Sequence, residues 1–221
     1  MSKKKNSNEE RFLKFLNEEN LLRFLGKEKL AKYLKLNTKL DNLSRKIIHS
    51  LSAFAICLFP YIFTIGQIIF LCALFALIFI SGHLFNFLGI INKVKRSSWG
   101  DVFYPLGVLI SVLLFLPHHV AAFQFGVLVL GFSDTLANIV GSLWGKHKVK
   151  ILGGSKSLEG SSAFFLSVIL LLFFFSLPAL SFNISAYLLI ALILTFLESV
   201  LVFGLDNLIL PALAAYLFTL I

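Results

Sequence analysis

Five acidic residues follow position 46, and each lies in or beside an apolar run, where acids are rare. They are Asp101, Asp134, Glu159, Glu198 and Asp206. Asp134 is the deepest, in the stretch "GFSDTLANIVGSLWGKHK", with Asn138 one helical turn later. An acid at the centre of a membrane helix costs about 2.5–3.5 kcal/mol, so acids kept there usually carry function. Because hard oxygen ligands suit Mg²⁺ or Ca²⁺, we expect these five acids to indicate a site for a divalent cation.

Basic side chains form a second group at the start of the first apolar run. In "SRKIIHS", His49 lies one helical turn after Arg45, and Lys46 lies beside them. Exposed amides at a helix N-terminus also favour anions, so this group predicts a site for a polyphosphate. The alternative is an ordinary basic flank that only orients the helix in the membrane.

The loop "GKHKVKILGGSKSLEGS" carries a third polar group, in which Lys146, Lys156 and Ser157 are candidate phosphate ligands. It is not a P-loop, because Ser155 stands where that motif needs a glycine before the lysine. Ser157 and Glu159 also fit an N-cap and a first-turn acid of the following helix, which would be a structural role.

The elements that hold these residues are predicted by composition. The chain has 221 residues, of which 58% are hydrophobic and 14% charged, with a mean hydropathy of +0.89. Soluble domains average about 25% charged residues, so the sequence indicates an all-α, polytopic membrane helix bundle. We predict seven transmembrane helices, at 47–64, 66–90, 102–117, 119–144, 161–178, 184–203 and 206–221.

The basic residues orient this bundle. If the N-terminus is cytoplasmic, the cytoplasmic segments 1–46, 91–101 and 145–160 hold 13, 3 and 4 basic residues, which are all 20 in the chain. This bias predicts a cytoplasmic N-terminus. The domains are then a basic amphipathic cytoplasmic segment at 1–44 and a transmembrane domain at 45–221. The first is an anchor on anionic lipid or a solvated extension, and nucleic-acid binding is not expected.

Small residues recur every four positions at Ser133, Ala137, Gly141 and Gly145, which is typical of close helix packing. Asp134 and Asn138 form the neighbouring stripe. We therefore expect both side chains to face the interior of the bundle.

Five motifs in order resemble the polyprenol kinase family, which includes dolichol kinases, phytol and farnesol kinases and CTP-dependent diacylglycerol kinases. The motifs cover residues 45–221 and read "RKIIH", "GDVFYPLG", "SDTLANIVGSLWGKHK", "KSLEGS" and "GLDNLILP". The resemblance implies phosphoryl transfer from a nucleoside triphosphate, CTP, to a lipid alcohol at the cytosolic membrane face, with Mg²⁺ or another divalent cation. The matching positions are Arg45, Lys46, His49, Asp134, Gly141, Gly145, Lys146, Lys156, Ser157, Glu159, Gly160, Asp206 and Asn207.

In this hypothesis Asp134 and Asp206, with Glu198 or Glu159, hold the cation, and a carboxylate or His49 orients the attacking hydroxyl. The acceptor is a polyprenol or dolichol, phytol or farnesol, or diacylglycerol. The alternatives are a phosphatidate cytidylyltransferase, which the family resembles in this region, and a transporter, which buried acids also suit. The expected location is a bacterial inner membrane, or the endoplasmic reticulum in a eukaryote.

Overall fold

The computed structural model describes residues 43–85, 99–151, 154–180 and 182–221, and these are mostly helical. The chain divides into two compact units, 1–44 and 45–221. The amphipathic segment predicted at 1–44 lies outside the described residues, except for its last two positions. The second unit contains every site residue predicted from the sequence.

A helix overlaps each of the apolar runs predicted from the sequence, within the described residues. The elements after the helix of residues 43–62 are α3 (Ile65–Leu84), α4 (Gly100–Phe115), α5 (Val120–Leu128), the π-helical turn η2 (Val129–Ser133), α6 (Asp134–Leu143), β1 (Lys148–Ile151), β2 (Gly154–Ser157), α7 (Leu158–Ser176), the 3₁₀ turn η3 (Leu177–Ala179), α8 (Ile184–Val200) and α9 (Leu205–Phe218). The segments α5, η2 and α6 form one continuous apolar helix, Val120–Leu143.

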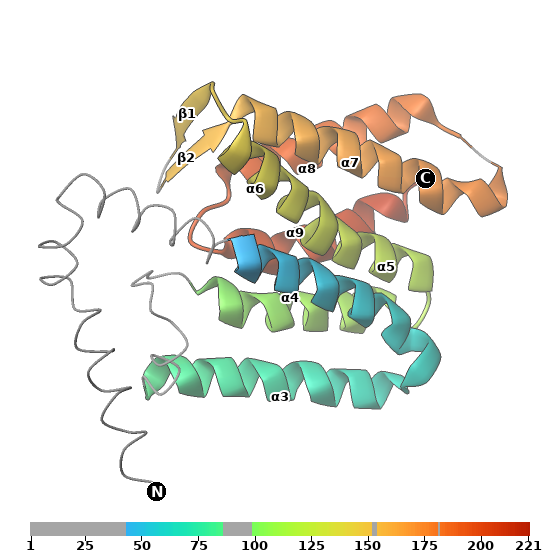
Figure 1. The fold of residues 1–221 in the computed structure, drawn as a ribbon. Helices are drawn as coiled ribbons and strands as arrows, with labels where there is room; N and C mark the ends of the chain where they lie inside the picture. Colours follow the sequence, from blue (N-terminus) through green and yellow to red (C-terminus); the bar gives the residue numbers. More distant parts are fainter. Residues whose placement is uncertain (1–42, 86–98, 152–153, 181) are drawn as a thin grey trace, which may run out of the picture. The chain divides into compact units, whose positions relative to one another are not determined.

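Successive helices run in opposite directions (Figure 1). The β1–β2 hairpin therefore shares one end of the bundle with the starts of helix 43–62, α4, α7 and α9 and the ends of α3, α6 and α8. We call this the hairpin end. The described acidic and basic residues of the second unit lie on the hairpin or on the parts of the helices nearer to it. The sequence predicted that these residues would gather at one end.

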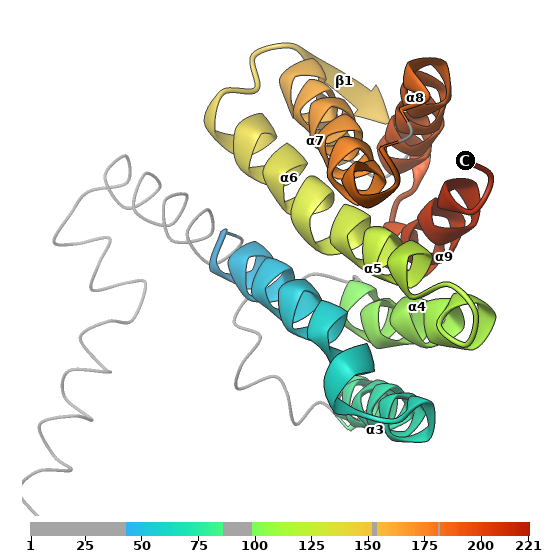
Figure 2. The ribbon, with the colours of Figure 1, turned by 90° about the vertical axis from the view of Figure 1, so that its right-hand side faces the viewer.

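Small residues let α9 approach its neighbours closely. It packs against α4, α5 and α8, and α7 packs against α6 and α8 (Figure 2). A side chain at Gly107 of α4 would overlap the carbonyl of Asn207, and one at Gly126 of α5 would overlap the carbonyl of Pro211. The core is apolar and includes Phe123. Close backbone contact of this kind is typical of helices packed within a membrane.

Three described helices are long and apolar enough to cross a membrane: Ile65–Leu84, Val120–Leu143 and Leu158–Ala179. The helices Gly100–Phe115, Ile184–Val200 and Leu205–Phe218 are apolar but shorter. Large apolar side chains such as Phe70, Phe174 and Phe196 are exposed on the bundle surface. These features suit a membrane protein. The count of seven spans and the cytoplasmic N-terminus stay predictions.

Two features differ from the α-helices and connecting loops that the sequence predicted. The loop after α6 contains an antiparallel hairpin in which Lys148 pairs with Ser157 and Ile151 with Gly154. Its first strand, "KVKI", alternates polar and apolar residues, a period-two pattern that favours a strand over a helix. The second departure is the π-helical turn η2, which ends directly before Asp134.

Candidate active site

Asp134 forms a buried ion pair with Lys46 of helix 43–62. The Asp134 side chain is 3% exposed, and that of Lys46 is 15% exposed. The adjacent Thr135 hydroxyl donates a hydrogen bond to the Lys46 backbone carbonyl at 3.1 Å. The side chain and the backbone of Lys46 thus both bind residues at the start of α6. This fixes a carboxylate and an ammonium group together at the hairpin end.

A second ion pair, buried on its acidic side, joins Lys156 of β2 to Glu198 near the end of α8. The Lys156 ammonium group also donates to the Glu198 backbone carbonyl at 3.0 Å. Burial lowers the pKa of Lys156, but the charges of Glu198, Asp134 and Asp206 and the hydrogen bond to Glu198 outweigh it and raise the pKa. Lys156 therefore stays protonated, and it fastens the hairpin to α8.

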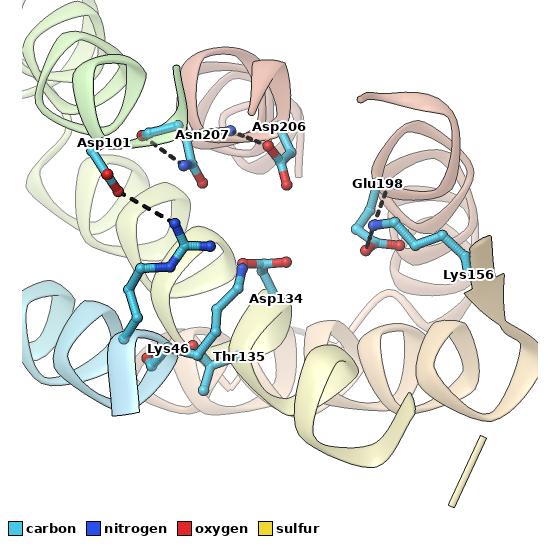
Figure 3. Close-up of polar contacts among 10 residues, drawn as sticks. Lys46, Asp101, Asp134, Thr135, Lys156, Glu198, Asp206 and Asn207 are labelled. Carbon is cyan, nitrogen blue, oxygen red and sulfur yellow. Dashed lines mark hydrogen bonds and ion pairs between the residues drawn. The ribbon is translucent and has the colours of Figure 1, made fainter. Parts of the chain in front are cut away.

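The start of α9 supplies Asp206 and Asn207. The Asn207 backbone N–H donates to the Asp206 carboxylate at 3.0 Å, and its side-chain amide donates to the Gly100 carbonyl of α4 at 2.8 Å. Figure 3 shows Asp206 on α9 and Glu198 on α8, in the same region as Asp134 on α6. The three acids repel one another electrostatically. Three helices thus place the three acids in one region of the hairpin end, and the cation site predicted for them stays a prediction.

The oxygen ligands around Asp134 suit a cation that binds together with a phosphate group. Among the described residues, no three His, Cys, Asp or Glu side chains are close enough to hold a metal ion. However, three buried oxygens, Ser133 Oγ, Glu198 Oε2 and Asn207 Oδ1, have no hydrogen-bond partner in the described structure. Mg²⁺ is usually bound by one or two carboxylates together with substrate phosphates and waters. The residues therefore fit a shared Mg²⁺ site of that kind.

His49 lies beside this group and is held by Tyr104 of α4. The two rings are 3.9 Å apart between centroids. The Ser52 hydroxyl donates to the His49 carbonyl at 2.8 Å and lies 2.9 Å from the Tyr104 hydroxyl. His49 also interacts electrostatically with Asp134. Its position permits the predicted role in orienting a hydroxyl, but nothing in the structure separates it from a carboxylate in that role.

Other predicted site residues lie at the periphery. Arg45 pairs with Asp101 at 3.7 Å, with both side chains about half exposed. The Glu159 carboxylate accepts a hydrogen bond from the His147 backbone N–H at 3.2 Å and lies 2.7 Å from the His147 ring, at the base of the hairpin. Lys146 is exposed. Their predicted roles in phosphate binding and catalysis gain no support from these positions.

Asn138 differs from the prediction, because it is exposed while Asp134 is buried. It lies one turn nearer the end of α6, where neighbouring elements cover the helix less completely and no residue from 138 to 144 is buried. The expectation that both side chains face the interior is wrong for Asn138.

Gly141, Ser157 and Gly160 form the contact between α6 and α7. The Ser157 hydroxyl accepts from the Gly160 backbone N–H at 3.1 Å and caps α7, as its alternative interpretation predicted. A Cβ atom on Gly160 would lie 2.7 Å from the Ala137 carbonyl oxygen, and one on Gly141 would lie 2.8 Å from the Ser157 hydroxyl. All three residues are explained by packing and capping, and the phosphate contact predicted for Ser157 stays a prediction.

Sequence reasoning missed Thr135 and Tyr104. Both lie within motifs already identified, "SDTLANIVG" and "GDVFYPLG". Neither residue type is distinctive by itself, and their partners are 89 and 52 residues away in the sequence. For Thr135, the position directly after Asp134 was the one sequence feature that could have indicated a role in the site.

Comparison with known proteins finds relatives that are named as lipid kinases. The chain is 31% identical over 127 residues to a phytol kinase of Synechocystis sp., a match that covers 55% of this chain and 54% of the relative. It is 38% identical over 73 residues to CTP-dependent diacylglycerol kinase 1 of Schizosaccharomyces pombe, covering 33% and 32%. These matches support membership of the polyprenol and lipid kinase family.

An uncharacterised protein of Methanocaldococcus jannaschii is 36% identical to the chain over 88 residues, covering 40% of this chain and 44% of that protein. The chain therefore spans about half or less of the length of the curated relatives it matches. No family model matches the chain. No solved structure matches it either.

Proposed function

We propose that this chain is an integral membrane lipid kinase that transfers a phosphoryl group from CTP to a lipid alcohol at the hairpin end. The observation that carries the proposal is the Asp134–Lys46 ion pair, whose charges interact electrostatically with those of Asp206 and Lys156. Support comes from relatives named as a phytol kinase and a CTP-dependent diacylglycerol kinase. An acceptor of the prenol or diacylglycerol class follows from those names.

Phosphoryl transfer depends on positioning and on neutralising charge, with little covalent work by the protein. Lys46 and Lys156 are the cations nearest the acids, and each is already desolvated by partial burial. In the proposed mechanism, they exchange their carboxylate partners for phosphate oxygens of the nucleotide. The exchange leaves the carboxylates of Asp134 and Glu198 available at the moment when phosphate enters.

Asp134 and Asp206, with the Asn207 side-chain oxygen, would hold Mg²⁺. When bound, this ion would neutralise charge on the phosphate oxygens. A carboxylate or His49 would orient the hydroxyl of the lipid and accept its proton. The lipid hydroxyl would reach these groups from the membrane surface while its tail stays among the exposed apolar side chains of the helices. The proposed location is the cytosolic face of the membrane.

The test is lipid phosphorylation by membranes that contain the protein, supplied with Mg²⁺, labelled CTP and either prenols or diacylglycerol. Label on the γ-phosphate should appear in the lipid, whereas transfer of label from the α-phosphate would indicate a cytidylyltransferase. Asp134→Asn should abolish the transfer, and the matched variant Asn138→Asp, which changes an exposed residue on the same helix, should leave the protein folded. Wild-type rates in Asp134→Asn membranes would exclude the proposed site.

A further inference from the structure

Helix 43–62 lies antiparallel to the continuous helix α5–α6 and is tied to it at two levels. At the hairpin end, Lys46 contacts Asp134 and Thr135. Toward the opposite end, the Gln124 side chain donates to the Cys57 carbonyl at 2.8 Å. These polar ties set the alignment of the two helices, and the distance between them depends on what lies in the middle.

Between the two ties, Ala53 packs directly on Gly131. Both residues are buried, and Ala53 is fully so. A Cβ atom on Gly131 would overlap the Ala53 methyl group, whereas its next neighbours, the Ala53 Cα at 3.5 Å and the His49 carbonyl oxygen at 3.6 Å, are ordinary contacts. A single methyl group therefore determines how closely the helices can approach.

Gly131 also lies at the centre of the π-helical turn η2, three residues before Asp134. Such turns carry one extra residue within an α-helix and are frequent at functional sites. The backbone of this turn lies against Ala53 of helix 43–62, and a glycine at position 131 permits this close approach.

We propose that the Gly131–Ala53 contact is a spacer that sets the reach from Lys46 to Asp134 and so positions both groups for catalysis. The catalytic part of this inference rests on the proposed function. An added methyl group at 131 must push helix 43–62 away, because Ala53 cannot rotate out of the contact. The Lys46 side chain and its carbonyl then move away from Asp134 and Thr135 together.

The experiment compares Gly131→Ala with the double variant Ala53→Gly/Gly131→Ala in the CTP-dependent lipid phosphorylation assay. Gly131→Ala should lower kcat by about 100-fold, because a misplacement of roughly 1 Å in an active site has that effect. The KM for the lipid should change little, since the lipid-facing surface is untouched. The double variant removes the clashing methyl group and should recover most of the lost kcat. Gly66→Ala is the control, because a Cβ there meets nothing within 4 Å.

Wild-type kcat in Gly131→Ala would overturn the spacer, and so would a folded double variant that recovers nothing. If Gly131→Ala fails to accumulate, the double variant alone decides by the same criterion. If the wild-type protein phosphorylates no lipid, the proposed function fails and the spacer is tested by thermal stability. A cycle of Gly131→Ala and Asp134→Asn should then be non-additive, because the first change already weakens the ion pair that the second removes. Additive effects would overturn it.

Discussion

Replacing Lys156 by Met would leave the Glu198 carboxylate buried without its cation. The Glu198 side chain is 3% exposed, and one of its oxygens already has no hydrogen-bond partner in the described structure. Breaking a buried pair in this way costs about 3–5 kcal/mol, because the remaining charge is desolvated and unpaired. Since the Lys156 side chain is 33% exposed, water reduces the loss, and we expect the lower end of that range, about 3 kcal/mol.

Equilibrium unfolding in mixed detergent micelles, followed by circular dichroism, measures this loss. The double variant Lys156→Met/Glu198→Gln removes both charges and should return to within about 1 kcal/mol of the wild type. Lys150→Met is the control, because it makes the same change at an exposed lysine on the neighbouring strand. The reasoning is refuted if Lys156→Met is as stable as Lys150→Met, or if the second substitution restores nothing.

Three further predictions concern the hairpin and the helix that follows it. The pKa of Lys156 is raised above 10.5. The contribution of its charge to the unfolding free energy is therefore complete at neutral pH and is lost only as pH rises through the raised pKa. The difference in unfolding free energy between Lys156→Met and wild type should be the same at neutral and mildly alkaline pH. Ser157→Ala removes the cap of α7 and should lower the unfolding free energy by about 1 kcal/mol, measured in the same micelles. Gly160→Ala presses a methyl group onto the Ala137 backbone carbonyl and should cost about 1–3 kcal/mol; unchanged stability would mean that α6 and α7 are farther apart than the structure has them.

The helices and the gathering of charge at one end could be predicted from sequence, because both follow from local pattern. Apolar runs separated by polar residues predict helices that alternate in direction. Alternation by itself then places Lys46, Asp134 and Asp206 at the same end of the bundle, although they are far apart in the chain. This part of the candidate site needed no knowledge of packing.

The pairing of individual charges could not be predicted in this way. Lys46 contacts an acid 88 residues away and Lys156 an acid 42 residues away, and each choice depends on how α6, α8 and the hairpin pack. The exposure of Asn138 also depends on packing. A residue four positions after Asp134 lies on the same face of the helix, but it lies one turn nearer the end of α6, where neighbouring helices no longer cover it. The π-helical turn has no sequence signal beyond Gly131, whose meaning appears only once Ala53 lies against it.

The pairing of both partly buried lysines, Lys46 and Lys156, has a consequence for how an anion would enter. A lysine that already neutralises a carboxylate presents no net positive charge, so the resting site does not attract a bare triphosphate electrostatically. A nucleotide that brings its own cation adds less charge and supplies the carboxylates with a replacement partner as the lysines leave them. We therefore expect the protein without substrate to bind the metal complex of the nucleotide in preference to the metal-free nucleotide, because the complex carries less negative charge.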